Sequence, residues 1–214
     1  MKNLESYKVL LWDFDGVIMD SMPIRELGFR KVLEDFPDKE VEKLIHFHRE
    51  NGGLSRYVKF RYFYGEILKM TIAEEEFNQL TQKFSDIMRE LLISSELLIK
   101  DSLEYIQANF QKLPMHVVSG SDGEELRYLC SQLGLSKYFK SIHGSPTTKI
   151  KLIKELLESE HYNESDVLMI GDSRNDKDAA YTNEIAFAAY NNELLRSTDY
   201  LYIDSFRKLL KAIE

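Results

Sequence analysis

Two aspartates near the start of the chain, Asp13 and Asp15, follow the short apolar run 9–12 and precede Gly16. Residues two apart on an extended chain project to the same side, so both carboxylates would lie together. Gly16 would permit a sharp backbone turn just past them. Neighbouring carboxylates repel each other unless a proton or a cation balances them, so this pair is a candidate site. The alternative is an Asp-Gly turn that only closes a strand.

Further polar residues follow other apolar runs along the chain. Ser119 ends one such run, and Asp172 and Asp176 come after another, while Lys149 begins a predicted helix. Ligands of open parallel sheets bind beyond the carboxyl ends of the strands, so we expect these groups at one rim. Carboxylates from two strands can bind Mg²⁺, which usually keeps water and substrate phosphate as further ligands. A hydroxyl and an ammonium group suit the remaining phosphate oxygens.

Each of these residues also has an ordinary structural explanation. Ser119 would then only cap the helix that follows it, and Asp176 would only be a helix-capping acid. Lys149 would be a solvated lysine, although a positive charge at a helix start opposes the helix dipole. The functional interpretation requires that Asp13 and Asp172 share one cation and that Lys149 points into their cleft.

Alternating strands and helices predict the fold that positions these groups. The expected strands are 7–12, 114–119, 141–143, 167–170, 185–189 and 200–203. The expected helices between and after them are 103–111, 123–133, 149–158, 179–183 and 205–213. This alternation implies an α/β fold with a Rossmann-like, three-layer core, in which helices cover both faces of a parallel sheet.

The segment between the first two strands shows helical periodicity only. Segment 38–49 has apolar residues at helical spacing and is followed by two glycines, which commonly end helices. Another helix is expected from residue 55, and Thr71 with Glu74 resembles a capping box for the next. We therefore predict two domains. Residues 1–18 and 95–214 would form the α/β core domain, and residues 19–94 would form an inserted helical cap domain.

Composition limits the classes of partner. The 214 residues include 36 acidic and 28 basic ones, and the formal charge of −8 argues against non-specific binding to nucleic acid or anionic membranes. Cys130 is the sole cysteine, so no internal disulfide can form, which fits a reducing compartment. We recognise no signal peptide and no apolar run of membrane-spanning length. We expect a cytoplasmic protein that binds neither nucleic acid nor membranes.

The sequence resembles the haloacid dehalogenase-like superfamily, in particular its subgroup of phosphoglycolate phosphatases and β-phosphoglucomutase-like proteins with a helical cap. Residues 13–21 (DFDGVIMDS) match the family's first motif, and residues 117–119 (VVS) match its second. Lys149 matches the third motif, and residues 171–176 (GDSRND) match the fourth. All four motifs occur in the family's order, and the resemblance spans the chain.

The resemblance implies a Mg²⁺-dependent phosphatase that acts on a small phosphorylated metabolite, of the sugar phosphate or phosphoglycolate type. Asp13 would attack phosphorus and become an aspartyl phosphate. Asp15 would protonate the leaving oxygen and then deprotonate the hydrolytic water. The implied magnesium ligands are Asp13, Asp172, the backbone carbonyl of Asp15, and Asp176 either directly or through water.

The resemblance also implies contacts to the substrate. Ser119 and Lys149 would hold the transferring phosphoryl group, and the backbone at Gly120 would add N–H donors. Residues 53–56 (GLSR) resemble a cap segment of β-phosphoglucomutase-like members, so Arg56 would face an anionic group of the substrate. The alternative for Arg56 is a solvated helix arginine. The nearby aromatic residues are expected to form the core of the lobe: Tyr57, Phe60, Phe63 and Tyr64.

Several alternatives remain open at this point. Phosphosugar mutases of the same subgroup carry a threonine and a histidine where this chain has Ser21 and Arg25, which favours a phosphatase. Ser21 is nonetheless a candidate substrate-binding residue. A phosphonatase would need a cap lysine, for which Lys59 and Lys69 are available. A non-catalytic binding module on the same fold is the third alternative. Arg49, Lys59 and Arg61 would give the lobe a basic cluster; we assign His46 and His48 no role.

Overall fold

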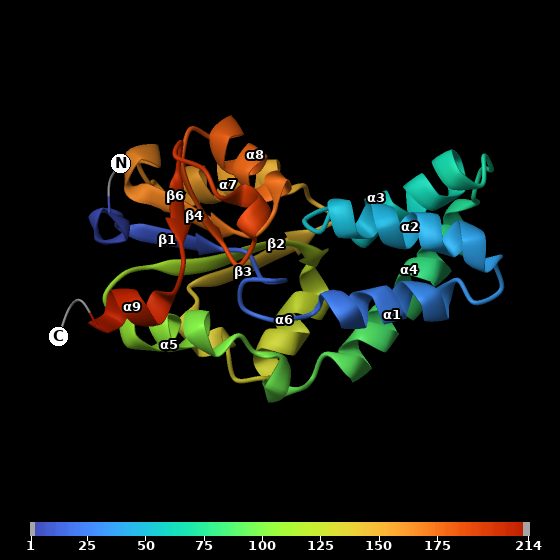
Figure 1. Ribbon diagram of the computed structural model, residues 1–214, viewed down its shortest axis with the longest axis horizontal. Helices are drawn as coiled ribbons and strands as arrows, with labels where there is room; N and C mark the ends of the chain where they lie inside the picture. The colour runs from blue at the N-terminus through green and yellow to red at the C-terminus, as the bar shows by residue number, and fades with distance from the viewer. Residues whose placement is uncertain (1–2, 212–214) are drawn as a thin grey trace.

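The computed structural model describes residues 3–211, and its centre is one six-stranded parallel sheet (Figure 1). Its strands are β1 (Val9–Trp12), β2 (Met115–Asp122), β3 (Ser141–Ser145), β4 (Val167–Gly171), β5 (Ala186–Tyr190) and β6 (Leu201–Ile203). Their order, β3-β2-β1-β4-β5-β6, reverses between β1 and β4. Sheets of this topology bind ligands at that reversal. Because Trp12 pairs with Ile170, the polar residues after both strands start side by side.

Helices cover both faces of the sheet, as the alternation of strands and helices predicted. These helices are α5 (Lys100–Asn109), α6 (Gly123–Gln132), α7 (Lys149–Glu160), α8 (Arg174–Thr182) and α9 (Phe206–Lys211). Leu10 and Trp12 pack toward α5, α6 and α9, whereas Val9 and Leu11 pack toward α7 and α8. The predicted α/β fold with three layers is confirmed.

The chain between β1 and α5 forms a separate helical lobe at the right of Figure 1. Its helices are α1 (Met22–Val32), α2 (Asp38–Glu50), α3 (Arg56–Tyr62), a π-helical turn (Phe63–Ile67) and α4 (Glu74–Leu91). Phe29 lies at the lobe's centre, with its ring 5.3 Å from that of Phe60 and 4.5 Å from that of Phe84. Phe60, Phe63 and Tyr64 are buried, in line with the expected aromatic core.

The structure corrects some local expectations. The predicted capping box at Thr71 is wrong, because α4 begins after Ala73 without a side-chain cap. Three acidic residues in the first turn of α4 instead stabilise the helix through its dipole. The predicted helix 205–213 is observed over Phe206–Lys211, and residues 212–213 lie outside the described part. Short 3₁₀ turns link other elements, at Leu4–Ser6, Ser95–Leu97, Ser136–Tyr138, Glu164–Asp166 and Glu193–Leu195.

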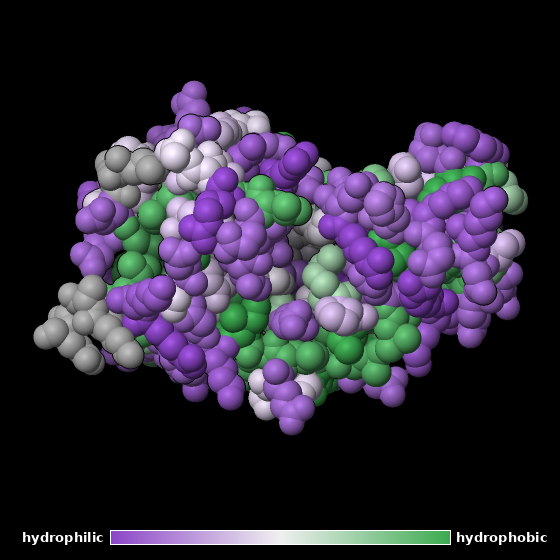
Figure 2. All heavy atoms as spheres, in the orientation of Figure 1, coloured by the Kyte–Doolittle hydropathy of each residue, from purple (hydrophilic) through white to green (hydrophobic). Residues whose placement is uncertain are grey.

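The described helices are too short or too polar to cross a lipid bilayer; this holds for residues 3–211. Cys130 is buried on α6. The surface is indented between the helical lobe and the sheet domain, as the space-filling view shows (Figure 2). The predicted site lies at this junction.

Candidate active site

Three aspartates converge at the carboxyl edge of the sheet. Asp13 follows β1, Asp172 follows β4, and Asp176 lies in the first turn of α8. One carboxylate oxygen of each lies within 4.8 Å of the others, so all three can contact one ion. Asp13 and Asp176 are buried, and Asp172 is partly buried. The sequence-predicted pair Asp13 and Asp172 is therefore close enough to share a cation.

Two glycines permit this convergence. Gly16 adopts a left-handed conformation with φ of +76°, and a Cβ there would lie 2.0 Å from Asp172 Oδ2. A Cβ on Gly171 would lie 2.4 Å from the Cγ of Asp176. Any larger residue at either position would displace a carboxylate of the cluster.

Lys149 points into the cluster. Its Nζ donates to Asp13 Oδ1 at 2.9 Å and also donates to Asp176 Oδ1. The side chain is buried, and α7 begins at Lys149 directly after Thr148, whose side chain caps the helix. Lys149 is thus not a solvated first-turn lysine. Asp176 belongs to this cluster and also caps α8, because its Oδ2 accepts from the Ser173 backbone at 3.0 Å in a capping box.

The cluster carries more negative than positive charge. Burial and then the nearby carboxylate of Asp176 raise the pKa of Asp13 to about 7, although Lys149 lowers it. Burial, Asp13 and Asp176 likewise raise the pKa of Asp172 well above its ordinary value. Crowded oxygen donors whose charge one ammonium group does not balance match the chemistry of a Mg²⁺ site. The residues present therefore fit this ion.

Asp15 lies beside this cluster in a different environment. Its Oδ1 accepts from Arg25 Nε at 2.7 Å and from Ser21 Oγ, and its Oδ2 accepts from Ser121 Oγ at 2.5 Å. Burial opposes ionisation of Asp15, but Arg25 and the two hydroxyl groups outweigh it and hold the pKa below its usual range. Asp15 is thus an ionised carboxylate with both oxygens engaged. Ser21 contacts this carboxylate rather than the cavity.

Ser121 had no predicted role, although the same period-two spacing that joined Asp13 and Asp15 also joins it to Ser119. Ser119 is buried, and its Oγ accepts from the Ser121 backbone at 3.1 Å. It does not cap α6; Asp122 does, accepting from the backbone of Glu125 at 2.9 Å. The capping explanation for Ser119 is therefore wrong.

Two arginines of the lobe meet a buried acid of the sheet domain. Glu125 on α6 is fully buried, and its Oε2 accepts from Arg56 Nη2 at 2.6 Å. Its Oε1 accepts from Arg25 Nη1 at 3.1 Å. Arg56 also donates to Ser85 Oγ at 2.5 Å. Arg56 is thus not solvated, and its guanidinium group is held by Glu125 although the residue lines the site.

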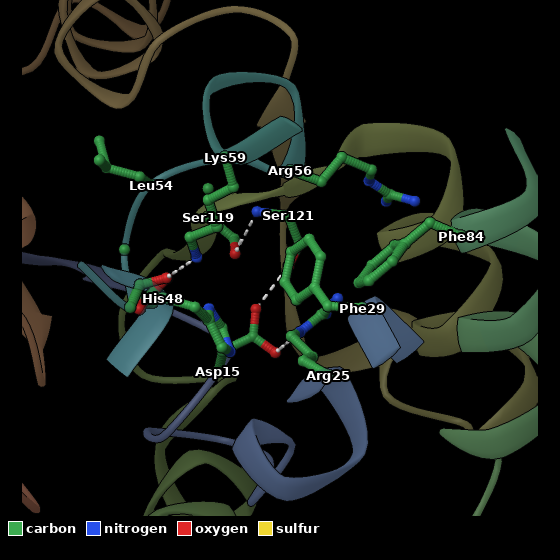
Figure 3. Close-up of a pocket in the computed structure, with 14 residues that line it drawn as sticks. Asp15, Arg25, Phe29, His48, Leu54, Arg56, Lys59, Phe84, Ser119 and Ser121 are labelled. Atoms are coloured by element: carbon green, nitrogen blue, oxygen red, sulfur yellow. Dashed lines mark hydrogen bonds and ion pairs between the residues drawn. The ribbon is translucent and has the colours of Figure 1, made fainter. Parts of the chain in front are cut away.

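A small cavity lies between the lobe and the sheet domain (Figure 3). Its volume is about 20 Å³, enough for roughly one water molecule. The sheet domain contributes Asp13, Asp15 and residues 119–121. The lobe contributes Arg25, Phe29, His48, residues 52–54, Arg56, Lys59 and Phe84. A Cβ on Gly120 would lie 2.2 Å from the backbone oxygen of Gly53, so the two bodies are in contact here.

Of two further lining residues, His48 had no predicted role, and Lys59 was predicted only as one of two lysines available to a phosphonatase. His48 occupies a position on the buried stripe of α2, with Val41 and Leu44, and that stripe was the available signal. The predicted basic cluster does not form as one group. Arg49 is exposed and pairs with Glu26, and Arg61 pairs with Glu74, while Lys59 is buried in the cavity wall.

The chain was compared with known proteins. The family model described as haloacid dehalogenase-like hydrolase matches residues 10–190. A phosphoglycolate phosphatase of Photobacterium profundum is 24% identical over 230 aligned positions, which cover 100% of this chain and 99% of the relative.

Two solved structures share the fold. One is described as a predicted phosphoglycolate phosphatase from Haemophilus somnus, with a TM-score of 0.74, 18% identity, and coverage of 99% of this chain and 100% of that one. The other is the family protein YfnB from Bacillus subtilis bound to magnesium. Its TM-score is 0.68 and its identity is 19%, and the alignment covers 97% of this chain and 98% of that one.

Proposed function

This chain belongs to the haloacid dehalogenase-like hydrolase family, and on that premise we propose that it is a Mg²⁺-dependent phosphatase of a small phosphorylated metabolite. The observation that carries the proposal is the placement of Asp13, whose carboxylate lies against Lys149 and within reach of an ion shared with Asp172. The similarity to a phosphoglycolate phosphatase supports a substrate of that size.

Asp13 would be the nucleophile. Its carboxylate oxygen would form a bond to phosphorus as the ester P–O bond breaks, leaving an aspartyl phosphate that water then hydrolyses. Asp15 would give a proton to the leaving oxygen and take one from that water. Arg25 keeps Asp15 ionised in the free protein, and the charge of a bound phosphate dianion would raise the pKa of Asp15 toward the proton-donating form.

The other groups would manage charge. A bound Mg²⁺ would supply screening between the nucleophile and the phosphate, with Asp13, Asp172 and Asp176 as side-chain ligands and the Asp15 carbonyl as a further one. Ser119, the backbone N–H of Gly120 and Lys149 would hold the phosphoryl oxygens. Lys149 touches the nucleophile already, so its ammonium group lies where negative charge develops.

The helical lobe, residues 19–94, would act as a cap. A cavity of about 20 Å³ has no room for a phosphate ester, so substrate entry requires the lobe to move away from the sheet domain. Re-closure would exclude water from the reacting groups. We also keep a cytoplasmic location as part of the proposal.

The experiment is phosphate release from p-nitrophenyl phosphate and a metabolite panel, with Mg²⁺ and with EDTA. We expect Mg²⁺-dependent release that Asp13→Asn abolishes. Undiminished release by Asp13→Asn would contradict the mechanism. Conversion of a hexose 1-phosphate to its 6-phosphate, faster than phosphate release, would favour the mutase alternative. Failure to bind beryllium fluoride at Asp13, together with no turnover, would favour the non-catalytic alternative.

A further inference from the structure

The cavity wall formed by the lobe contains buried polar atoms that lack partners. Arg25 Nη2 and both ring nitrogens of His48 accept or donate no hydrogen bond. Lys59 Nζ donates only to the backbone oxygen of Gly52, at 3.1 Å, and within residues 3–211 it has no carboxylate partner. All three side chains are at least nine-tenths buried: the residues are 6%, 0% and 3% exposed.

Unpartnered buried polar groups are rare, and each one requires an explanation. Arg25 and His48, which hold three such atoms, line one cavity together with Lys59, and Figure 3 shows the three side chains around the same space. Groups that converge in this way are typical of a site whose partner is a ligand rather than protein.

The charge of this wall identifies the class of ligand. Arg25 and Arg56 are positively charged, and the carboxylates that face them are Asp15 and Glu125. Burial and then the nearby Arg25 lower the pKa of Lys59 to about 7, and a bound anion would favour the charged form of this amine. Burial and then the nearby cations Lys59 and Arg25 lower the pKa of His48 to about 2, so its ring is neutral and retains one N–H donor. An anion would satisfy every unpartnered donor here.

We propose that Lys59, His48 and Arg25 form a subsite for a second anionic group of the substrate. The substrate class is then a short phosphate monoester that also carries a carboxylate, rather than a neutral sugar phosphate; this rests on the phosphatase function proposed above. Arg56 is a positioning residue in this arrangement, because Glu125 and Ser85 hold its guanidinium group.

The first test compares two esters of matched size. Phosphoglycolate carries the carboxylate, and 2-hydroxyethyl phosphate replaces it with a neutral group. We expect wild-type protein to prefer phosphoglycolate in kcat/KM, and Lys59→Met to lower that preference about 10- to 100-fold, the value of a charge-assisted contact. Lys69→Met is the matched control, because Lys69 is exposed and pairs with Glu66. An unchanged preference in Lys59→Met would overturn the proposal.

His48→Gln tests the second member of the subsite. We expect a smaller loss of the same preference, about 3- to 10-fold, since a neutral donor contributes less than a cation. His46→Gln on the same helix is the control, because His46 is exposed and faces Glu50. A lower kcat on both esters with the preference unchanged would show a merely structural role and count against the proposal.

A binding experiment separates this inference from the phosphatase function. Calorimetry in Mg²⁺ would compare 3-phosphonopropionate, which cannot be hydrolysed, with propylphosphonate. Tighter binding of 3-phosphonopropionate than of propylphosphonate, lost in Lys59→Met, would support the subsite even if no ester is turned over. Equal affinity of the wild type for both overturns it. Borohydride-dependent attachment of phosphonoacetaldehyde to Lys59 would assign this amine to imine chemistry instead, and would also overturn it.

Discussion

The two walls of the cavity differ in charge and in how they are assembled. On the sheet side, Asp13, Asp172 and Asp176 outnumber the single ammonium group of Lys149. On the lobe side, Arg25 and Arg56 pair with carboxylates, whereas buried Lys59 donates to a backbone oxygen and other polar atoms lack partners. In our proposal, a metal ion would complement the first wall and a substrate anion would complement the second. The difference indicates that reaction chemistry and substrate choice lie on opposite walls of one small space.

The largest expected effect removes the nucleophile from the sheet wall. Asp13→Asn should lower kcat more than about 10⁴-fold, because no amide can replace the attacking carboxylate. The variant should fold, since the substitution also removes a crowded buried carboxylate. Steady-state kinetics with circular dichroism checks both statements. Activity within tenfold of wild type would break the assignment of chemistry to this wall.

Removing the cation of the sheet wall is expected to rank second. Lys149→Met should lower kcat about 10²- to 10³-fold through lost stabilisation of the transition state. In EDTA it should also lower the free energy of unfolding by about 3 kcal/mol, since buried carboxylates lose their partner. Urea unfolding and kinetics measure these effects. Lys151→Met is the control, as Lys151 is exposed on the same helix, and equal effects in both variants would contradict the account.

Much of the sheet wall could be predicted from sequence, and little of the lobe wall could. Asp13 and Asp172 follow strands that pair directly, so local patterns and sheet topology were enough to bring them together. Glu125 on α6 and Lys59 on α3 take their places only when the lobe packs against the sheet domain, which no local spacing encodes. His48 lay on a readable apolar stripe, but its unpartnered nitrogens required the neighbouring elements to be placed.

The contact between the walls gives a third, smaller effect. Glu125→Gln removes the charge that holds Arg25 and Arg56 together, so we expect about 2–3 kcal/mol lower stability and roughly tenfold lower kcat/KM. Thermal unfolding measures the loss of stability, and steady-state kinetics measures kcat/KM. The neighbouring Glu124→Gln, on an exposed side chain, is the control. No loss of stability in Glu125→Gln would show that this network does not join the two walls.

The smallest expected effect is the pH dependence of the stability that the fold gains when Mg²⁺ binds. The pKa of Asp13 is about 7 in the folded, metal-free protein, above the ordinary unfolded value of about 3.9. The folded state therefore binds more protons, so this group lowers stability as pH rises between about 4 and 7. Mg²⁺ should offset this loss, and the rise in Tm on adding Mg²⁺ should grow by a few degrees from pH 5 to pH 8. A rise in Tm that is independent of pH, or that Asp13→Asn retains unchanged, would contradict this prediction.

The most direct test of the central claim is acid quenching during turnover, followed by peptide mapping by mass spectrometry. We predict one phosphoryl group on the peptide that contains Asp13, formed only when Mg²⁺ is present and absent in Asp13→Asn. Continued phosphate release with no phosphorylated peptide, or with the phosphoryl group on another residue, would contradict the account.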